Sequence, residues 1–158
     1  MVNKQKMDYF HGDETLLDQI KPLWEALNEH HRQYSSNFKE HYDRMTFEER
    51  KADLLKKAAL GKMRVDLVAD KAAGQNVGYC VSSLDSEKTG EIESIFVDAV
   101  YRRMGIGDSL MKNALSWMEQ EGAVAKIVEV AAGNEKAFDF YGRYGFLPRK
   151  TVLKQVKK

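Results

Sequence analysis

The chain of 158 residues has few of the residues that interrupt or crosslink a fold, since it contains only two prolines and one cysteine. The lone Cys80 cannot form an internal disulfide, and the residues before Met7 lack the apolar segment of a secretory signal. Both absences favour the reducing cytoplasm. Because Cys80 lies in the apolar run Tyr79 to Val81, we expect a buried hydrophobic residue and not a nucleophile.

Long hydrophobic runs and an excess of one charge are also missing. The longest apolar stretch, residues 122–133, is broken by Lys126 and Glu129 and falls short of the roughly 20 residues that a membrane-spanning helix needs. The 25 Lys and Arg are balanced by 24 Asp and Glu, whereas nucleic-acid binders depend on a basic excess. We therefore expect neither a membrane nor a nucleic acid as a partner.

The length of the chain fits one domain over residues 1–158, because it allows one sizeable core and has no repeats or linkers. Apolar periodicity predicts alternating strands and helices. The expected elements are a strand over 7–11, a helix over 22–32, a helix capped by Thr46 and ended by Gly61, three strands between 64 and 97, a helix over 108–121, a strand over 126–131, a helix over 135–144 and one or two strands within 146–156.

The order β-α-α-β-β-β-α-β-α-β predicts an α/β fold with a central mixed, mostly antiparallel sheet. Short turns favour antiparallel pairing of the early strands, and strand-helix-strand crossovers place the fourth and fifth strands parallel. Parallel strands whose carboxyl ends adjoin helix starts form a natural ligand cleft. We therefore expect the chemistry of this protein at that place.

A glycine turn follows the fourth predicted strand, in the segment Arg102-Arg103-Met104-Gly105-Ile106-Gly107. Two glycines allow a tight turn and a close ligand approach, and the following helix start offers free N–H groups to an anion such as a pyrophosphate. The alternative is a tight turn with solvated arginines. A dinucleotide-binding motif would carry three glycines after the first strand, and a P-loop would carry Gly-Lys-Ser/Thr, so neither nucleotide motif fits.

This turn resembles the acetyl-coenzyme A motif of the GNAT superfamily of N-acetyltransferases, Arg/Gln-x-x-Gly-x-Gly/Ala after an apolar-apolar-Val triplet. Here the triplet is Ile95-Phe96-Val97, and Arg102, Gly105 and Gly107 match the motif. The segment from Asn134 to Phe146 is similar to a second motif of the family, Asn-x-x-Ala-x-x-Phe-Tyr-x-x-x-Gly-Phe. Two motifs in the family's order make the resemblance specific.

The resemblance implies a cofactor site. In the family, a bulge separates the fourth strand from the fifth, and the pantetheine arm pairs with the freed backbone. Phe96 and Val97 would supply these groups, with the Val97 amide facing the thioester carbonyl. Amides from Arg103 to Asp108 would cradle the pyrophosphate. The cofactor-binding residues expected are Ile95, Phe96, Val97, Arg102, Arg103, Met104, Gly105, Ile106, Gly107, Asp108, Asn134 and Tyr141.

Tyr141 matches the family tyrosine beside the sulfur, where a phenol can hydrogen-bond to or protonate the departing thiolate. Periodicity alone would make Tyr141 a core residue on the same stripe as Tyr144. Asn134 would contact the cofactor arm and also fits an ordinary helix cap.

Proton removal from the acceptor amine needs a base, and the fourth predicted strand offers Glu93 first and Glu91 second. Strand alternation places both on one face, although charged strand residues usually mark a solvent face. All four histidines, His11, His30, His31 and His41, precede residue 42. Adjacent His30 and His31 cannot face one side of a helix together, so we expect exposed side chains and no metal site.

The sequence therefore predicts an acetyl-coenzyme A-dependent N-acetyltransferase that moves an acetyl group directly to a primary amine of a small molecule or peptide. The main alternative is a non-catalytic acyl-coenzyme A-binding sensor or interaction module on the same fold. The segment 33–45 should overhang the acceptor end of the cleft, but its residues do not identify the acceptor. Similar proteins often dimerise, so a homodimer is a further expectation.

Overall fold

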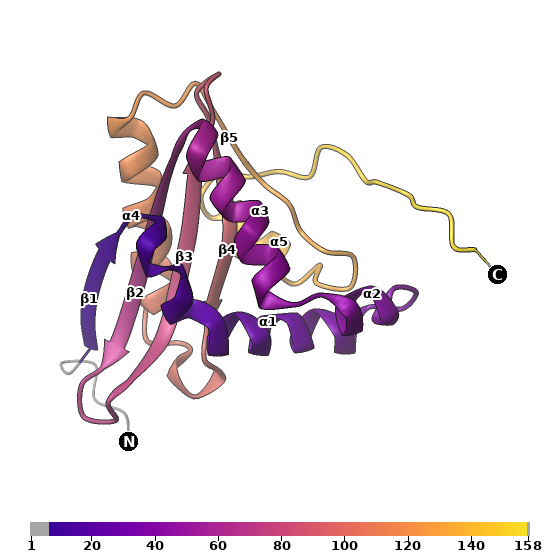
Figure 1. Ribbon diagram of the computed structural model, residues 1–158, viewed down its shortest axis with the longest axis horizontal. Helices are drawn as coiled ribbons and strands as arrows, with labels where there is room; N and C mark the ends of the chain where they lie inside the picture. The colour runs from indigo at the N-terminus through magenta and orange to yellow at the C-terminus, as the bar shows by residue number, and fades with distance from the viewer. Residues whose placement is uncertain (1–6, 158) are drawn as a thin grey trace.

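A computed structural model describes residues 7–157, and its centre is a five-stranded sheet (Figure 1). The strands are β1 (Met7–Gly12), β2 (Lys62–Asp70), β3 (Gln75–Leu84), β4 (Thr89–Val97) and β5 (Ala125–Val128), and they lie in sequence order. Neighbours are antiparallel from β1 to β4, whereas β4 and β5 are parallel. The mixed α/β sheet predicted from the sequence is thereby confirmed.

Helices cover both faces of this sheet. They are η2 (Glu14–Ile20), α1 (Lys21–Tyr34), α2 (Lys39–Arg44), α3 (Phe47–Leu60), η3 (Ala99–Tyr101), α4 (Ile106–Gln120) and α5 (Ala137–Gly142). Figure 1 shows α1 and α3 on one face and α4 on the other. Pro22 lies in the first turn of α1, where a missing N–H costs no helical hydrogen bond. Thr46 caps α3 as predicted, because its hydroxyl accepts from the Glu49 N–H at 3.2 Å.

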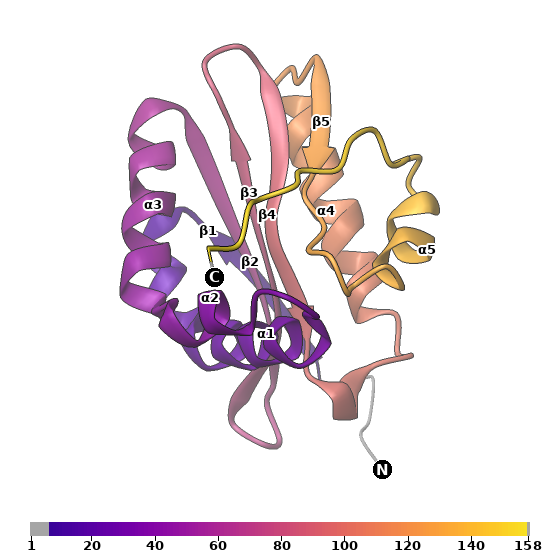
Figure 2. The ribbon, with the colours of Figure 1, turned by 90° about the vertical axis from the view of Figure 1, so that its right-hand side faces the viewer.

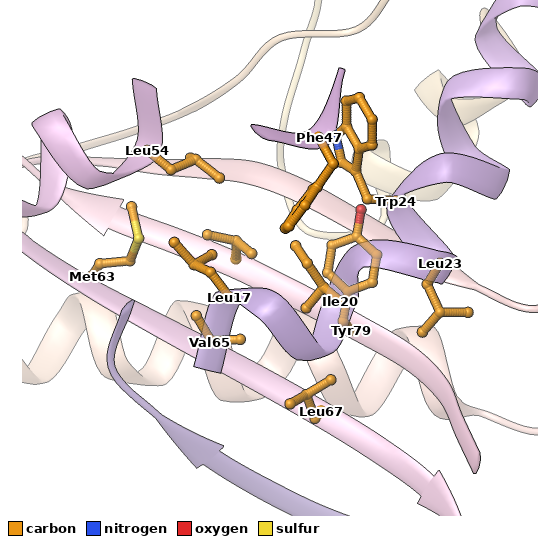
Figure 3. Packing of buried hydrophobic residues seen from close by; sticks show 11 residues of the cluster. Leu17, Ile20, Leu23, Trp24, Phe47, Leu54, Met63, Val65, Leu67 and Tyr79 are labelled. Atoms are coloured by element: carbon orange, nitrogen blue, oxygen red, sulfur yellow. The ribbon is translucent and has the colours of Figure 1, made fainter. Parts of the chain in front are cut away.

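Each face of the sheet has its own apolar cluster. Between the sheet and helices α1 and α3, Trp24 and Phe47 meet at 5.7 Å between ring centroids and lie near Tyr79 of β3 (Figure 3). On the other face, α4 packs its buried residues against the sheet. They are Ile106, Leu110, Met111, Ala114 and Met118. The strands β2 and β3 are therefore largely buried from both sides, whereas most of β4 is only partly buried.

Several boundaries differ from the predicted ones. Helix α4 begins at Ile106 and not near Asp108, because Gly105 takes the left-handed conformation at its N-cap, with φ of 81°. Strand β5 ends at Val128, three residues early, where it separates from β4. Helix α5 spans only Ala137–Gly142 of the predicted 135–144.

The strands predicted within 146–156 are not formed. In the described chain up to residue 157, no strand follows α5. The alternating apolar residues of this segment have no adjacent strand edge, and Pro148 lacks the N–H that a ladder needs. All side chains from Leu147 to residue 157 are exposed.

None of the helices within residues 7–157 is both long and apolar enough to cross a bilayer.

Candidate active site

The candidate site lies where β4 and β5 part. Their parallel pairing runs from Thr89 opposite Ala125 to Ile92 opposite Val128, whereas β4 continues to Val97. The register against β3 shifts at the same point, since Ser94 faces Val81 but Ile92 faces Ser82. Glu93 is thus the extra residue of a bulge, which bends and twists its strand. Beyond it, the outer edge of β4 has no partner strand among the described residues.

The hydrogen-bond phase of β4 decides which backbone groups face this open edge. The Asp98 N–H donates to the Val77 carbonyl of β3 at 2.8 Å, which fixes the inward phase. Because inward and outward groups alternate, Phe96 pairs with β3, and the N–H and C=O groups of Ile95 and Val97 point outward. The Val97 amide therefore faces the gap between β4 and β5. For Phe96 the expected outward backbone is wrong, because the register turns its N–H and C=O inward.

Arg102 joins the end of β4 to the glycine turn. Its Nε donates to the Val97 carbonyl at 2.9 Å, and its guanidinium lies 5.3 Å from the centroid of the Phe96 ring. The outward carbonyl of Val97 therefore already accepts a hydrogen bond, whereas its outward N–H is free to donate one to a ligand. Phe96 contributes its ring, not its backbone, to this corner.

Helix α3 holds the bulge from one face of the sheet. Arg50 Nη2 donates to the Glu93 main-chain carbonyl at 2.9 Å and lies 3.3 Å from its carboxylate. Lys57 Nζ and the Ser83 hydroxyl each lie 2.7 Å from Glu93 Oε1. The Glu93 side chain is only 1% exposed, although the residue as a whole is partly exposed, so the accessible part is its main chain. The buried side chain of Glu93 therefore links the bulge in β4 to Arg50 and Lys57 of α3.

Glu91 is the more accessible of the two carboxylates expected to act as base. Lys57 Nζ lies 3.4 Å from Glu91 as well as 2.7 Å from Glu93, which confirms that both face α3. Burial, together with the neighbouring charge of Glu93, raises the pKa of Glu91, and Lys57 opposes this shift. The Glu91 side chain is 19% exposed. It is a carboxylate with raised basicity that solvent can still reach.

The glycine turn leads directly into α4. Arg103 and Gly105 both have left-handed backbone conformations, with φ of 63° and 81°. A non-glycine residue rarely adopts this conformation, and such strain gathers at functional turns. Since Ser109 makes the first helical bond, to the Gly105 carbonyl at 3.1 Å, the amides of residues 106–108 have no helical acceptor. They form a positively polarised helix start beside the open edge.

Asp108 adds a negative charge to this helix start, but its carboxylate is engaged. It accepts from the Tyr144 hydroxyl at 2.6 Å and lies 2.9 Å from Lys112 Nζ. Hydrogen bonds from Lys112 and Tyr144 hold the pKa of Asp108 below its usual value. Burial and Asp108 raise the pKa of Tyr144 to about 12. A Cβ on Gly107 would lie 3.5 Å from the Phe140 ring, so Gly107 faces α5.

Tyr141 differs from Tyr144 in one respect that bears on chemistry. Its ring packs against Phe140 and Phe146, at 5.2 and 6.2 Å between centroids. Its hydroxyl makes no hydrogen bond with another described residue, whereas that of Tyr144 is bound to Asp108. Burial raises the pKa of Tyr141, which keeps the phenol protonated near neutral pH. Of the two tyrosines on α5 and its C-terminal turn, Tyr141 has the free donor.

Gly133 was not among the predicted site residues, yet it joins the turn after β5 to the end of α1. Its φ is 99°, and a Cβ built on it would lie 2.1 Å from the Tyr34 carbonyl at the end of α1. The turn after β5 therefore touches the start of the segment 33–45. The glycine content of the turn was the available signal, but its contact with α1 is not local in sequence.

Other expected roles are changed or confirmed by their positions. Asn134 does not cap α5, whose N-cap is Lys136; its carbonyl accepts from the Ala137 N–H within the preceding turn. Cys80 is fully buried in β3 as predicted, and burial raises the pKa of its thiol to about 12.

The histidines lie on the first strand and the first two α-helices. His31 is not the exposed side chain that we expected, since its ring packs 5.7 Å from that of Tyr42 on α2. Burial lowers the pKa of His31.

These features define an α/β domain whose sheet opens between two parallel strands, beside a glycine turn that starts a helix. Solved structures share this fold. A GCN5-related N-acetyltransferase from Ralstonia eutropha aligns over 95% of this chain and 98% of its own, with a TM-score of 0.73 and 18% identity. An aminoglycoside N-acetyltransferase in complex with CoA aligns over 96% and 95%, with a TM-score of 0.67 and 17% identity.

Sequence comparison gives the family. A model of the acetyltransferase (GNAT) family matches residues 23–146, and the chain therefore belongs to the GNAT family of acetyltransferases. An uncharacterized N-acetyltransferase of Methanocaldococcus jannaschii is 35% identical over 96 residues, which are 54% of this chain and 42% of that protein. Human N-alpha-acetyltransferase 30 is 33% identical over 82 residues, 49% of this chain and 23% of its own length. The chain spans less than half the length of these relatives.

Proposed function

We propose that the protein is an acetyl-coenzyme A-dependent N-acetyltransferase that transfers the acetyl group directly to a primary amine of a small molecule or peptide. One observation carries the proposal: β4 runs on to Val97 after its pairing with β5 has stopped at Ile92. An unpaired strand edge can bind an extended amide-containing chain through its backbone. This edge leads to the helix start at residues 106–108.

The residues at this place fit the chemical parts of acetyl-coenzyme A. The outward groups of Ile95 and Val97 suit the amides of a pantetheine arm, and the polarised start of α4 suits a diphosphate. The exposed side chains of Arg102 and Arg103 add positive charge beside that helix start. When bound, the cofactor supplies an activated acetyl thioester.

The chain's own residues would divide the remaining tasks. The Val97 N–H would donate to the thioester carbonyl oxygen at the open edge. The free hydroxyl of Tyr141 would donate to the thioester sulfur. Glu91, with its raised pKa, would take the proton of an acceptor ammonium through water, while Glu93 keeps the bulge in place. Direct transfer is favoured because Cys80 is fully buried and protonated at neutral pH.

The names of similar proteins support amine acceptors of two kinds. Relatives named N-alpha-acetyltransferase 30 and 50 point to peptide α-amines. A neighbour of the same fold was solved with a bisubstrate analogue joining CoA to acetylneamine, which points to amino sugars. We propose a primary amine as the shared chemistry. The single buried Cys80 fits the reducing cytoplasm, where we place the protein, and we also propose a homodimer.

The test is release of free thiol from acetyl-coenzyme A in the presence of polyamines, aminoglycosides, amino acids and peptides with free N-termini. We expect turnover with at least one of these classes and a matching mass increase of one acetyl group on the acceptor. Calorimetry on the same sample distinguishes the alternative function. Tight binding of acetyl-coenzyme A with no turnover in the whole panel would favour a non-catalytic acyl-coenzyme A-binding module.

A further inference from the structure

Three carboxylates lie together on the face of the sheet that carries α3. Glu91 and Glu93 belong to β4, and both contact Lys57 of α3. Glu129 follows two residues after Ile127, the register partner of Glu91, and alternation along the chain gives it the same face. The negative charge of Glu129 also raises the pKa of Glu91, which agrees with this placement. Three like charges in one place need a cation nearby, or one of them takes up a proton.

Helix α3 supplies two cations to this group of carboxylates. Arg50 and Lys57 are seven residues apart, which is about two helical turns, so they lie on the same side of α3. The fully buried Leu54, between them in the sequence, packs that side into the apolar cluster on the sheet. Figure 2 shows α3 beside the strands, on the side of the sheet opposite to α4. The packing of one helix therefore brings both cations to β4.

The two cations make different contacts. Arg50 Nη2 donates to the main-chain carbonyl of Glu93 at 2.9 Å and lies 3.3 Å from the Glu93 carboxylate. Lys57 Nζ lies 2.7 Å from Glu93 Oε1 and 3.4 Å from Glu91 Oε1, so it bridges the two carboxylates. Among the residues that the structure describes, Lys57 is the one cation that forms an ion pair with Glu91.

We infer that Lys57 is a positioning residue for the proposed reaction: held by Glu93, its ammonium keeps the neighbouring Glu91 carboxylate ionised and in place. The inference rests on the proposed function, in which Glu91 takes the proton of an acceptor ammonium. The Glu93 side chain is 1% exposed and that of Glu91 19%, so Glu93 anchors the lysine while solvent still reaches Glu91. Lys57 acts through Glu91 and not on the acceptor itself.

The groups around Glu91 give the effect of Lys57 a definite sign. Burial and the charges of Glu93 and Glu129 raise the pKa of Glu91, whereas the charge and hydrogen bond of Lys57 lower it. From β3, the residue opposite Glu91 is Ser83, whose uncharged hydroxyl donates to Glu93. Without the lysine charge, the pKa of Glu91 would rise further. The carboxylate would then be protonated over more of the pH range in which it must accept a proton.

The experiment compares Lys57→Gln with the wild type in two measurements on the full chain. Glutamine removes the charge but keeps a hydrogen-bond donor for Glu93. Carboxyl-carbon NMR, with the Glu91 signal assigned from Glu91→Gln, should show Glu91 titrating about one pH unit higher in the variant. The acidic limb of kcat should move upward with it. Lys57→Arg, which restores the charge, should bring both back towards the wild type, and Lys56→Gln, at an exposed neighbour on α3, should change neither.

The two measurements separate this inference from the proposed function, because the NMR titration needs no turnover. A Glu91 titration that is unchanged in Lys57→Gln would overturn the inference even in an active enzyme. A titration that moves while the acidic limb of kcat stays in place would also overturn it, because Lys57 would then not act on the reaction through Glu91. A titration that moves in a protein that acetylates no amine would uphold the effect of Lys57 on Glu91 and reject the proposed function.

Discussion

At the scale of single residues, the hydroxyl of Tyr141 is the feature most open to a direct test. Tyr141→Phe should lower kcat about a hundredfold or more, because the only free phenolic donor of the α5 segment is removed. Affinity for acetyl-coenzyme A should change little, since the ring and its contacts with Phe140 and Phe146 remain. Steady-state kinetics with calorimetry separates the two. Tyr9→Phe, at an exposed tyrosine of β1, is the control.

An equal loss of cofactor affinity and turnover in Tyr141→Phe would contradict this assignment. It would mean that Tyr141 shapes the site by packing. Tyr144, on the same stripe, cannot replace the lost donor, because its hydroxyl already donates to Asp108.

The pH dependence of turnover tests Glu91 in the same way. Burial and Glu93 raise the pKa of Glu91 above its usual value of 4.5. Only the ionised form can accept a proton, so kcat should rise with pH through that raised pKa, and its acidic limb should lie above the range of an ordinary glutamate. Glu91→Gln should lower kcat and remove this limb. Glu87→Gln, on the exposed turn before β4, should leave the profile unchanged.

A Glu91→Gln profile that keeps the same acidic limb would assign the limb to another group. Glu93 is the poorer candidate, because two cations and a hydroxyl already surround its 1% exposed side chain.

At the scale of the elements, Gly133 couples the turn after β5 to the end of α1. Gly133→Ala should cost about 2 kcal/mol or more, because it forces a left-handed alanine and a Cβ 2.1 Å from the Tyr34 carbonyl. Thermal unfolding should show Tm lowered by about 4 °C or more. Gly142→Ala in α5 is the matched control: a Cβ there has nothing within 4 Å, so it should be neutral or add up to about 1 kcal/mol. Equal melting of the two variants would show that the contact is not rigid.

Local patterns were sufficient for most elements. The Thr46 cap, the three-strand meander and the parallel placement of β5 follow from neighbouring residues and short connections. The contacts of Arg50 with the bulge at Glu93 could not be predicted in this way, because the two residues are 43 positions apart and meet only when α3 packs on the sheet. The outward backbone expected for Phe96 came from the family resemblance, which gave it together with Val97; inward and outward groups alternate along a strand, so only one of these two neighbours can face the open edge.

The segment 146–156 shows the opposite failure, in which a local pattern was present but a partner strand was not. Alternating apolar residues predicted strands within 146–156, and strand propensity depends strongly on what packs beside the strand. A strand needs a partner edge, and none of the described strands pairs with the exposed residues that follow Phe146. The strands predicted within 146–156 were therefore wrong, because alternation of apolar residues alone does not supply a partner edge.

At the scale of the whole molecule, the two apolar clusters are joined through β3 and β4, while β5 is attached to them by only four paired positions. A ligand that bridges the open edge of β4 and the start of α4 should therefore stabilise the folded state. Acetyl-coenzyme A at a hundred times its Kd should add about 2.7 kcal/mol and raise Tm by about 5–11 °C. Pantetheine, which lacks the diphosphate, should give a much smaller shift at the same concentration, because it leaves the helix start at residues 106–108 without an anion. Equal shifts by the two ligands would contradict diphosphate binding at the glycine turn, and an equal shift by ADP would reassign the site to nucleotides.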